Sequence, residues 1–174
     1  MKKNIIVATL VAAAAMTTAS TFAADGQVNF SGSVIDASCN VTNATSGSLN
    51  VVLGQVSKSA FTAAGTKAAP TKFTLQVSNC PDSVSSVGVK FDGTTVAGDN
   101  SVLALTQGTG VATGVGIQLS DASQNVLPLN TASINYPLTA GAANLDFVAR
   151  YISTAATVTA GPANAIANFS IIYN

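Results

Sequence analysis

Hydrophobic and polar residues alternate in short runs along most of the chain, and almost no segment after residue 23 has helical periodicity. The runs are rich in Val, Ile, Leu, Phe and Thr and are separated by Gly, Asn, Asp, Ser and Pro, as in strands joined by turns. Strands are predicted at residues 28–39, 48–56, 72–79, 87–91, 102–105, 115–120, 132–136, 144–152 and 165–173. This spacing, with so little helix, predicts an all-β fold of the β-sandwich type.

Residues 144–152 have the pattern of a central strand. The four residues that share the apolar face are Leu145, Phe147, Ala149 and Tyr151. The opposite face is more polar and carries Arg150. We therefore expect this strand to have a neighbour on each side.

The strand predicted at residues 165–173 is unusual because no charge, proline or bulge protects it. An unpaired strand of this kind is a template for another chain, and proteins normally disguise such edges. Phe169, Ile171 and Tyr173 share one of its faces. They are equally consistent with the core of a complete sandwich.

A second unusual segment is formed by residues 24–34, called the arm below. One face of the arm would carry Gly26, Val28, Phe30, Gly32 and Val34, and the other face would be polar. Such regular alternation suggests a strand that lies in a groove. It also fits an ordinary first strand paired within its own chain, and we expect residues 33–39 to be such an intrachain strand in either case.

Residues 1–23 have the features of a secretory leader. Lys2 and Lys3 precede a short apolar run at residues 5–16, and the sequence Thr21-Phe22-Ala23 suits signal peptidase. The run is too short to span a bilayer. Cleavage after Ala23 would leave one domain that begins at Ala24, and cleavage after Ala24 is the alternative.

The charge of the remaining chain excludes several classes of function. Without Lys2 and Lys3, five Lys and Arg residues stand against seven aspartates, and Glu, His and Trp are absent from the sequence. Nucleic-acid binding needs clustered positive charge, which this chain lacks. Neither a nucleophile–base pair nor a carboxylate dyad can be assembled, so we expect no enzyme activity. No cofactor or metal site is expected.

Cys39 and Cys80 are the two cysteines of a chain predicted to leave the cytoplasm. A disulfide is the expected state of such a pair. A metal site is the rival interpretation, but it has too few ligands because no histidine exists.

Several short motifs occur in a fixed order. They are SGSVIDASCNV around Cys39, VVLGQV, the block around Asn79-Cys80, LDFVARYIST, and a penultimate Tyr173. Gly32 lies seven residues before Cys39, and Gly161 is the fourteenth residue counted back from Asn174. With these features the chain after the leader resembles the subunits of chaperone–usher fimbriae, most closely the type 1 major pilins.

The resemblance implies an incomplete immunoglobulin-like sandwich, completed by a donor strand from a neighbouring subunit. It implies that Val28, Phe30 and Val34 fill the neighbour's groove and that Gly32 passes a tight point. Gly26 departs from relatives that have a bulkier residue there. The residues implied at the groove edge and in chaperone binding are Gly161, Phe169, Ile171, Tyr173 and the carboxylate of Asn174, and residues 35–174 would form the pilin domain.

We therefore expect the major shaft subunit of a fimbrium used in cell adhesion by a Gram-negative bacterium. Its partners would be other copies of the chain in a head-to-tail polymer, a periplasmic chaperone and an outer-membrane usher. The chain would pass through the periplasm to the cell surface. A minor adaptor subunit of the same fimbrium and a one-domain adhesin that binds a host ligand are the alternatives.

Overall fold

The computed structural model of the chain describes residues 27–34 and 38–174. The chain divides into two units, Met1–Val34 and Ile35–Asn174, and each is described by itself. The expected leader, its cleavage site, Ala24 and Gly26 lie outside the described residues.

In the first unit, residues 27–34 form neither helix nor strand. Val28, Phe30 and Val34 are 77%, 93% and 101% exposed. The strand predicted at residues 28–39 is therefore wrong for all of its described residues, including the described part of the intrachain strand expected at 33–39. A strand needs a hydrogen-bonding neighbour, and residues 27–34 have none among the described residues.

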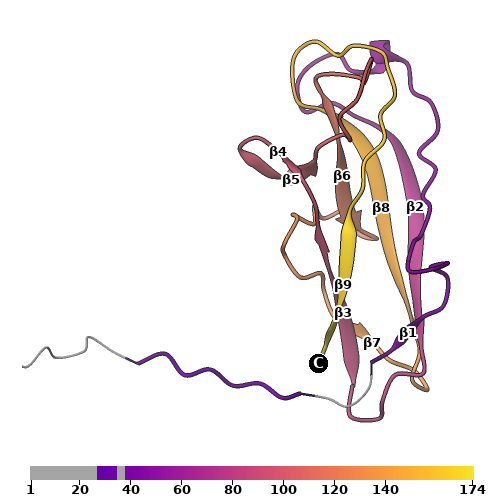
Figure 1. Ribbon diagram of the computed structural model, residues 1–174, viewed down its shortest axis with the longest axis vertical. Coiled ribbons are helices and arrows are strands. Elements are labelled where there is room, and N and C mark those ends of the chain that lie inside the picture. The colour runs from indigo at the N-terminus through magenta and orange to yellow at the C-terminus, as the bar shows by residue number, and fades with distance from the viewer. Residues whose placement is uncertain (1–26, 35–37) are drawn as a thin grey trace, which may run out of the picture. The chain divides into compact units, whose positions relative to one another are not determined.

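The regular secondary structure of the second unit is almost entirely β-strand (Figure 1). They are β1 (Asn40–Val41), β2 (Lys67–Ser78), β3 (Ser86–Asp92), β4 (Thr95–Val96), β5 (Asp99–Leu103), β6 (Val115–Asp121), β7 (Tyr136–Pro137), β8 (Ala143–Ser153) and β9 (Asn168–Tyr173). A 3-10 turn, η1, covers Lys58–Ala60. The predicted all-β fold is confirmed. No helix in the described ranges is long and apolar enough to cross a bilayer.

Two antiparallel sheets make up the sandwich. One contains six strands in the order β1-β2-β8-β6-β5-β4, and the other contains three in the order β7-β3-β9. Figure 1 shows β3 and β9 in front of the layer formed by β2, β8 and β6. The core between the sheets is apolar, with Leu75, Val89 and Phe147 almost completely buried.

The prediction of a central strand at residues 144–152 is confirmed. β8 pairs with β2 on one side and with β6 on the other. Leu145, Phe147, Ala149 and Tyr151 all belong to the core cluster. On the opposite face, Arg150 is half-buried, and its guanidinium donates to Ser120 Oγ at 2.8 Å and to the side-chain oxygen of Gln124.

Other boundaries differ from prediction for local reasons. β2 begins at Lys67 and not at residue 72, because a bulge between Ala68 and Thr71 accommodates Pro70 in the strand. β9 begins at Asn168 and not at residue 165, since its partner β3 has already ended at Asp92. The strand predicted at 48–56 is absent, because these residues have no neighbouring strand to pair with.

Candidate functional site

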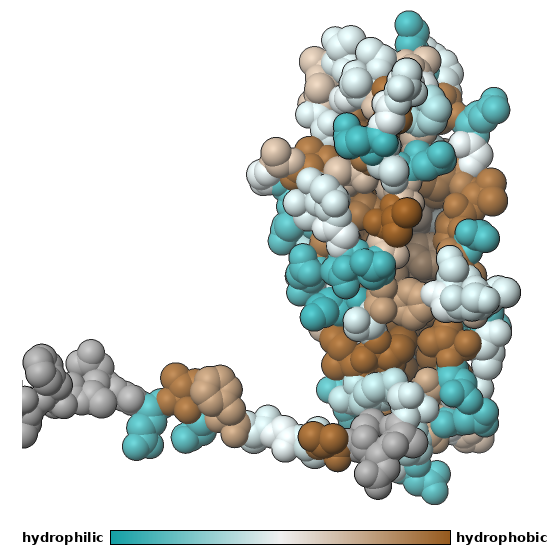
Figure 2. All heavy atoms as spheres, in the orientation of Figure 1, coloured by the Kyte–Doolittle hydropathy of each residue, from teal (hydrophilic) through white to brown (hydrophobic). Residues whose placement is uncertain are grey.

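A long apolar groove runs beside β9. Its first wall is formed by residues 47–56 and its second wall by residues 158–169, which include the start of β9. The two walls enclose a hollow of about 450 Å³. Figure 2 shows this strip as a hollowed band coloured brown and tan between β9 and the segment that precedes β2.

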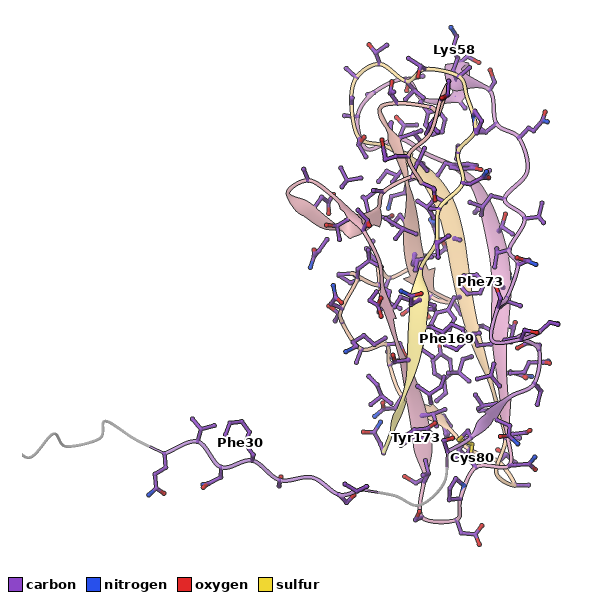
Figure 3. All side chains as sticks on the ribbon, in the orientation of Figure 1. Phe30, Lys58, Phe73, Cys80, Phe169 and Tyr173 are labelled. Carbon is purple, nitrogen blue, oxygen red and sulfur yellow. A yellow bond between two sulfur atoms is a disulfide. The ribbon has the colours of Figure 1, made fainter. Side chains whose placement is uncertain are left out.

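The floor of the groove is the core of the sandwich itself. The side chains that line it between the walls are Phe73, Leu75, Phe91, Leu103, Ile117, Leu119 and Ala149. Phe91 packs edge-on against Phe147 at 5.1 Å between ring centroids, and Phe73 lies 6.2 Å from Phe91. Core side chains are thus reachable through the groove, and Phe73 and Phe169 lie beside it in Figure 3.

Both walls have unpaired backbone. Among the described residues, the backbone N–H and C=O groups of residues 49–56 make no hydrogen bond within the chain. On the second wall, β9 pairs with β3 on one side only and is the edge of its sheet. Unpaired strand-like backbone on both sides of an apolar floor is the arrangement that accepts an added strand.

A second hollow of about 460 Å³ follows farther along the same two walls. Val56, Phe61, Val115 and Tyr151 are among its lining residues. Burial raises the pKa of the Tyr151 phenol, so that its hydroxyl keeps its proton. No carboxylate lines either hollow, and Lys58 is the one charged residue among the lining residues.

Gly161 lies in the second wall at this hollow, against the backbone of residues 110–112. A Cβ atom at Gly161 would overlap the carbonyl oxygen of Gly110 and would lie 2.6 Å from the Ala112 nitrogen. Ala112 N donates to Pro162 O at 3.0 Å beside it. Only glycine fits this close approach, because any side chain would push the second wall outward.

The remaining predicted groove-edge residues lie together on β9. Phe169, Ile171 and Tyr173 are half-buried and pack against the core cluster, with register partners Phe91, Val89 and Val87 on β3. Figure 3 shows Phe169 and Tyr173 on this strand.

Asn174 is tied to the start of β3. Its backbone oxygen accepts from Ser85 N at 2.8 Å, from Ser86 N at 3.1 Å and from Ser85 Oγ at 3.1 Å. Its side-chain amide donates to Asn135 Oδ1 at 3.0 Å. The last residue therefore continues the pairing of β9 with β3.

The predicted disulfide between Cys39 and Cys80 is confirmed, with the two Cα atoms 4.1 Å apart. Both cysteines are buried. The bond fixes the beginning of the second unit to the connection between β2 and β3.

Sequence reasoning missed the first wall. Its inward residues, Leu49, Leu53 and Val56, lie against the core cluster, whereas Val52 is 82% exposed. The sequence predicts a strand at residues 48–56, and the structure has no strand over these residues. Periodicity cannot tell a paired strand from an unpaired one, and the absence of a partner is visible only in three dimensions.

Comparison with known proteins identifies the family. A family model described as "Fimbrial protein" matches residues 28–174. The chain is 36% identical over 177 residues to a probable major fimbrial subunit, LpfA, of Escherichia coli O157:H7, covering 99% of this chain and 97% of the relative. It is 40% identical over 151 residues to the type-1 fimbrial protein C chain of Escherichia coli, covering 85% and 83%.

A solved structure of a chaperone–usher pilus superposes with a TM-score of 0.64 at 28% identity, covering 87% of this chain and 96% of that chain. Pilin subunits polymerise in chaperone–usher pili. Fimbrial proteins form surface appendages of Gram-negative bacteria such as Escherichia coli. This chain belongs to the fimbrial protein family and is an immunoglobulin-like structural subunit of the chaperone–usher type, not an enzyme.

Proposed function

We propose that this chain is the major shaft subunit of a fimbrium and that it polymerises by donor-strand exchange. In this scheme the arm of one copy fills the groove of the next. The observation that carries the proposal is the groove beside β9, which has an apolar floor and unpaired backbone on both walls. Its similarity to a probable major fimbrial subunit favours the shaft role over the adaptor role.

The arm has the length that the groove needs. As an extended strand, residues 24–34 would reach about 36 Å and residues 49–56 of the first wall about 26 Å. An arm between the walls could form main-chain hydrogen bonds with the first wall and with the free edge of β9. These bonds would supply affinity without requiring any particular side chain.

Side chains of the arm would then set the register. Val28, Phe30 and Val34 are exposed in the free chain and would face the floor, contributing roughly 1.5–3 kcal/mol each when buried. Gly32 would pass a tight point, and Gly26 would leave its part of the floor empty or shallow. In the free chain a Cβ atom at Gly32 would meet no atom within 4 Å, so any crowding would arise only in the groove.

Such an interface is heterologous and does not close, so it generates a filament. Before assembly, a periplasmic chaperone would cover the groove by pairing with β9 and would bind the carboxylate of Asn174. An outer-membrane usher would then exchange the chaperone for the next arm. The subunit would pass through the periplasm to the cell surface.

Electron microscopy of bacteria tests the proposal. Deleting residues 24–32 should abolish filaments while chaperone-bound subunits still accumulate, because the deletion leaves the described part of the pilin domain intact. The matched control carries Ser31→Ala and Ser33→Ala, which change only the polar face of the arm and should assemble normally.

Filaments formed without the arm would refute the donor role. Bacteria that lack this chain altogether distinguish a major subunit from a minor one. Loss of the entire shaft is expected of a major subunit. A shaft that persists, with an altered tip or length, would instead mean an adaptor or an adhesin.

A further inference from the structure

We propose that the Cys39–Cys80 disulfide is a tension clamp that isolates one subunit junction of the filament from the next. It would divert a pull on a subunit's own arm away from that subunit's first groove wall. The inference rests on the proposed donor-strand function, because only then does tension enter a subunit through its arm.

The order of the elements along the chain places the first wall between the arm and β2. Along the chain, the arm leads to Cys39, then to β1, then to the first wall and η1, and only then to β2. Without the disulfide, a pull on the arm would therefore be held first by the short pairing of residues 40–43 with β2 and then by the first wall. That wall is one half of the groove in which the next copy's arm would lie.

The first wall is weakly attached to its own domain. Within the described part of the molecule, no hydrogen bond joins residues 44–62 to the rest of the domain. Just before the wall, β1 pairs with β2 at Asn40 and Val41, and hydrogen bonds of Thr42 and Asn43 to the same strand extend this attachment by two residues. The wall is held instead by side-chain packing, with Phe61 buried and Leu49, Leu53 and Val56 half-buried against the core.

Cys80, in contrast, lies between two firmly held strands. β2 pairs with β8 along most of its length, and β3 pairs with β9 over six residue pairs. Cys80 N also donates to Gly141 O at 3.0 Å. The disulfide thus offers tension a covalent path from Cys39 directly into β2 and β3, which bypasses the first wall.

The two states of the bond predict different mechanical behaviour. With the bond intact, the first wall bears no tension from its own arm and keeps holding the neighbour's arm. With the bond reduced, the same pull would peel residues 40–66 from the domain and open the groove. Failure of one junction would then follow from tension on the adjacent junction.

Single-filament force spectroscopy on purified wild-type fimbriae tests this inference. Filaments are pulled before and after reduction with a phosphine, and thiol labelling of Cys39 and Cys80 measures the extent of reduction. Reduced filaments should rupture at lower force, and each opened subunit should first lengthen by less than about 90 Å, the extended length of residues 40–66 before the distance that they span in the folded domain is subtracted. Oxidised filaments should rupture without that step.

Two controls separate this role from general stabilisation. A Leu53→Ala filament with an intact disulfide has a looser wall and should rupture at lower force without the added step. As a second control, the rate of filament dissociation in denaturant is measured without load. Reduction should change this rate less than it changes the rupture force. If the Cys39→Ser/Cys80→Ser variant does not accumulate, the reduced wild-type filament still provides the measurement.

Equal rupture force and equal extension before and after reduction would overturn the clamp. An added length that corresponds to unfolding of the whole domain, and not of residues 40–66 alone, would also overturn the clamp. Failure of the underlying donor-strand function would look different, because filaments would then assemble from subunits that lack the arm.

Discussion

Replacing Phe30 by alanine should weaken the junction between subunits without unfolding either one. In the free chain Phe30 is 93% exposed, so its removal leaves the described part of the pilin domain unchanged. In the assembled state it would lie against a floor that contains Phe73, Phe91 and Leu119. The side chain therefore contributes only when the groove of a neighbour is filled.

The size of the effect follows from that difference in burial. Truncating a well-packed phenylalanine to alanine costs about 3–5 kcal/mol. The lower value corresponds to roughly a hundredfold weaker junction, since about 1.4 kcal/mol is a factor of ten. Most of this change should appear in the dissociation rate.

Filament disassembly in guanidinium, followed by size-exclusion chromatography, measures that rate. Phe30→Ala filaments should fall apart about one hundred times faster than wild type, and Ser31→Ala filaments within a few-fold of it. Chaperone-bound subunits should accumulate equally in all three strains. Equal disassembly of the Phe30 and Ser31 variants would refute the reasoning, because it would mean that the two faces of the arm are equivalent.

Three further predictions concern the wall, the register and acid stability. Gly161→Ala should destabilise the domain by roughly 1–3 kcal/mol in thermal unfolding, because its Cβ would overlap the backbone of residues 110–112. The control is Gly108→Ala, whose Cβ would meet only Val111 Cγ2 at 3.6 Å and should change the free energy of unfolding little. Inserting one serine between Phe30 and Ser31 should block assembly, because it places Val28 and Val34 on opposite faces of the arm. Inserting two serines returns them to one face and should restore assembly in part. Equal assembly of the two variants would contradict a fixed register. The Asn125 side-chain amide donates to Asp121 at 2.9 Å and lowers the pKa of that carboxyl, so its stabilisation is fully present above the unfolded-state pKa near 3.9 and is lost as pH falls through the lower folded-state pKa. Asn125→Ala should therefore be less stable than wild type at pH 7 in denaturant titrations, and the difference in unfolding free energy should shrink as the pH is lowered below about 3.9. A difference that stays constant on acidification would argue against this assignment.

The stability of the junction between subunits should change little with pH between about 5 and 8. The sequence contains no histidine, and no carboxylate lines the groove. No side chain with an ordinary pKa between 5 and 8 is therefore available to switch the interface.

Much of the fold could be predicted because its signals are local. Alternation in residues 144–152 identified β8 and its apolar face, and the two cysteines of an exported chain indicated their bond. The predicted ends of the strands were less accurate where tertiary contacts determine where a strand begins. The bulge at Pro70 that starts β2 five residues early is an example, since a proline normally argues against a strand.

The groove could be predicted only in half. The strand with Phe169, Ile171 and Tyr173 was expected at an edge because no charge, proline or bulge protects it, and β9 is an edge of its sheet in the structure. The first wall was not, because its sequence is that of an ordinary strand and only the sheet topology leaves it without a partner. Similarly, Gly161 is explained by one close backbone approach that links residues far apart in the sequence.

Cryo-electron microscopy of the purified filament tests the central claim most directly. The account predicts density for residues 24–34 of one copy between residues 49–56 and β9 of the next, with Val28 and Phe30 directed at the floor. The arm should make main-chain hydrogen bonds to β9 in that position. A filament in which this groove is empty, or is filled by the subunit's own arm, would contradict the account.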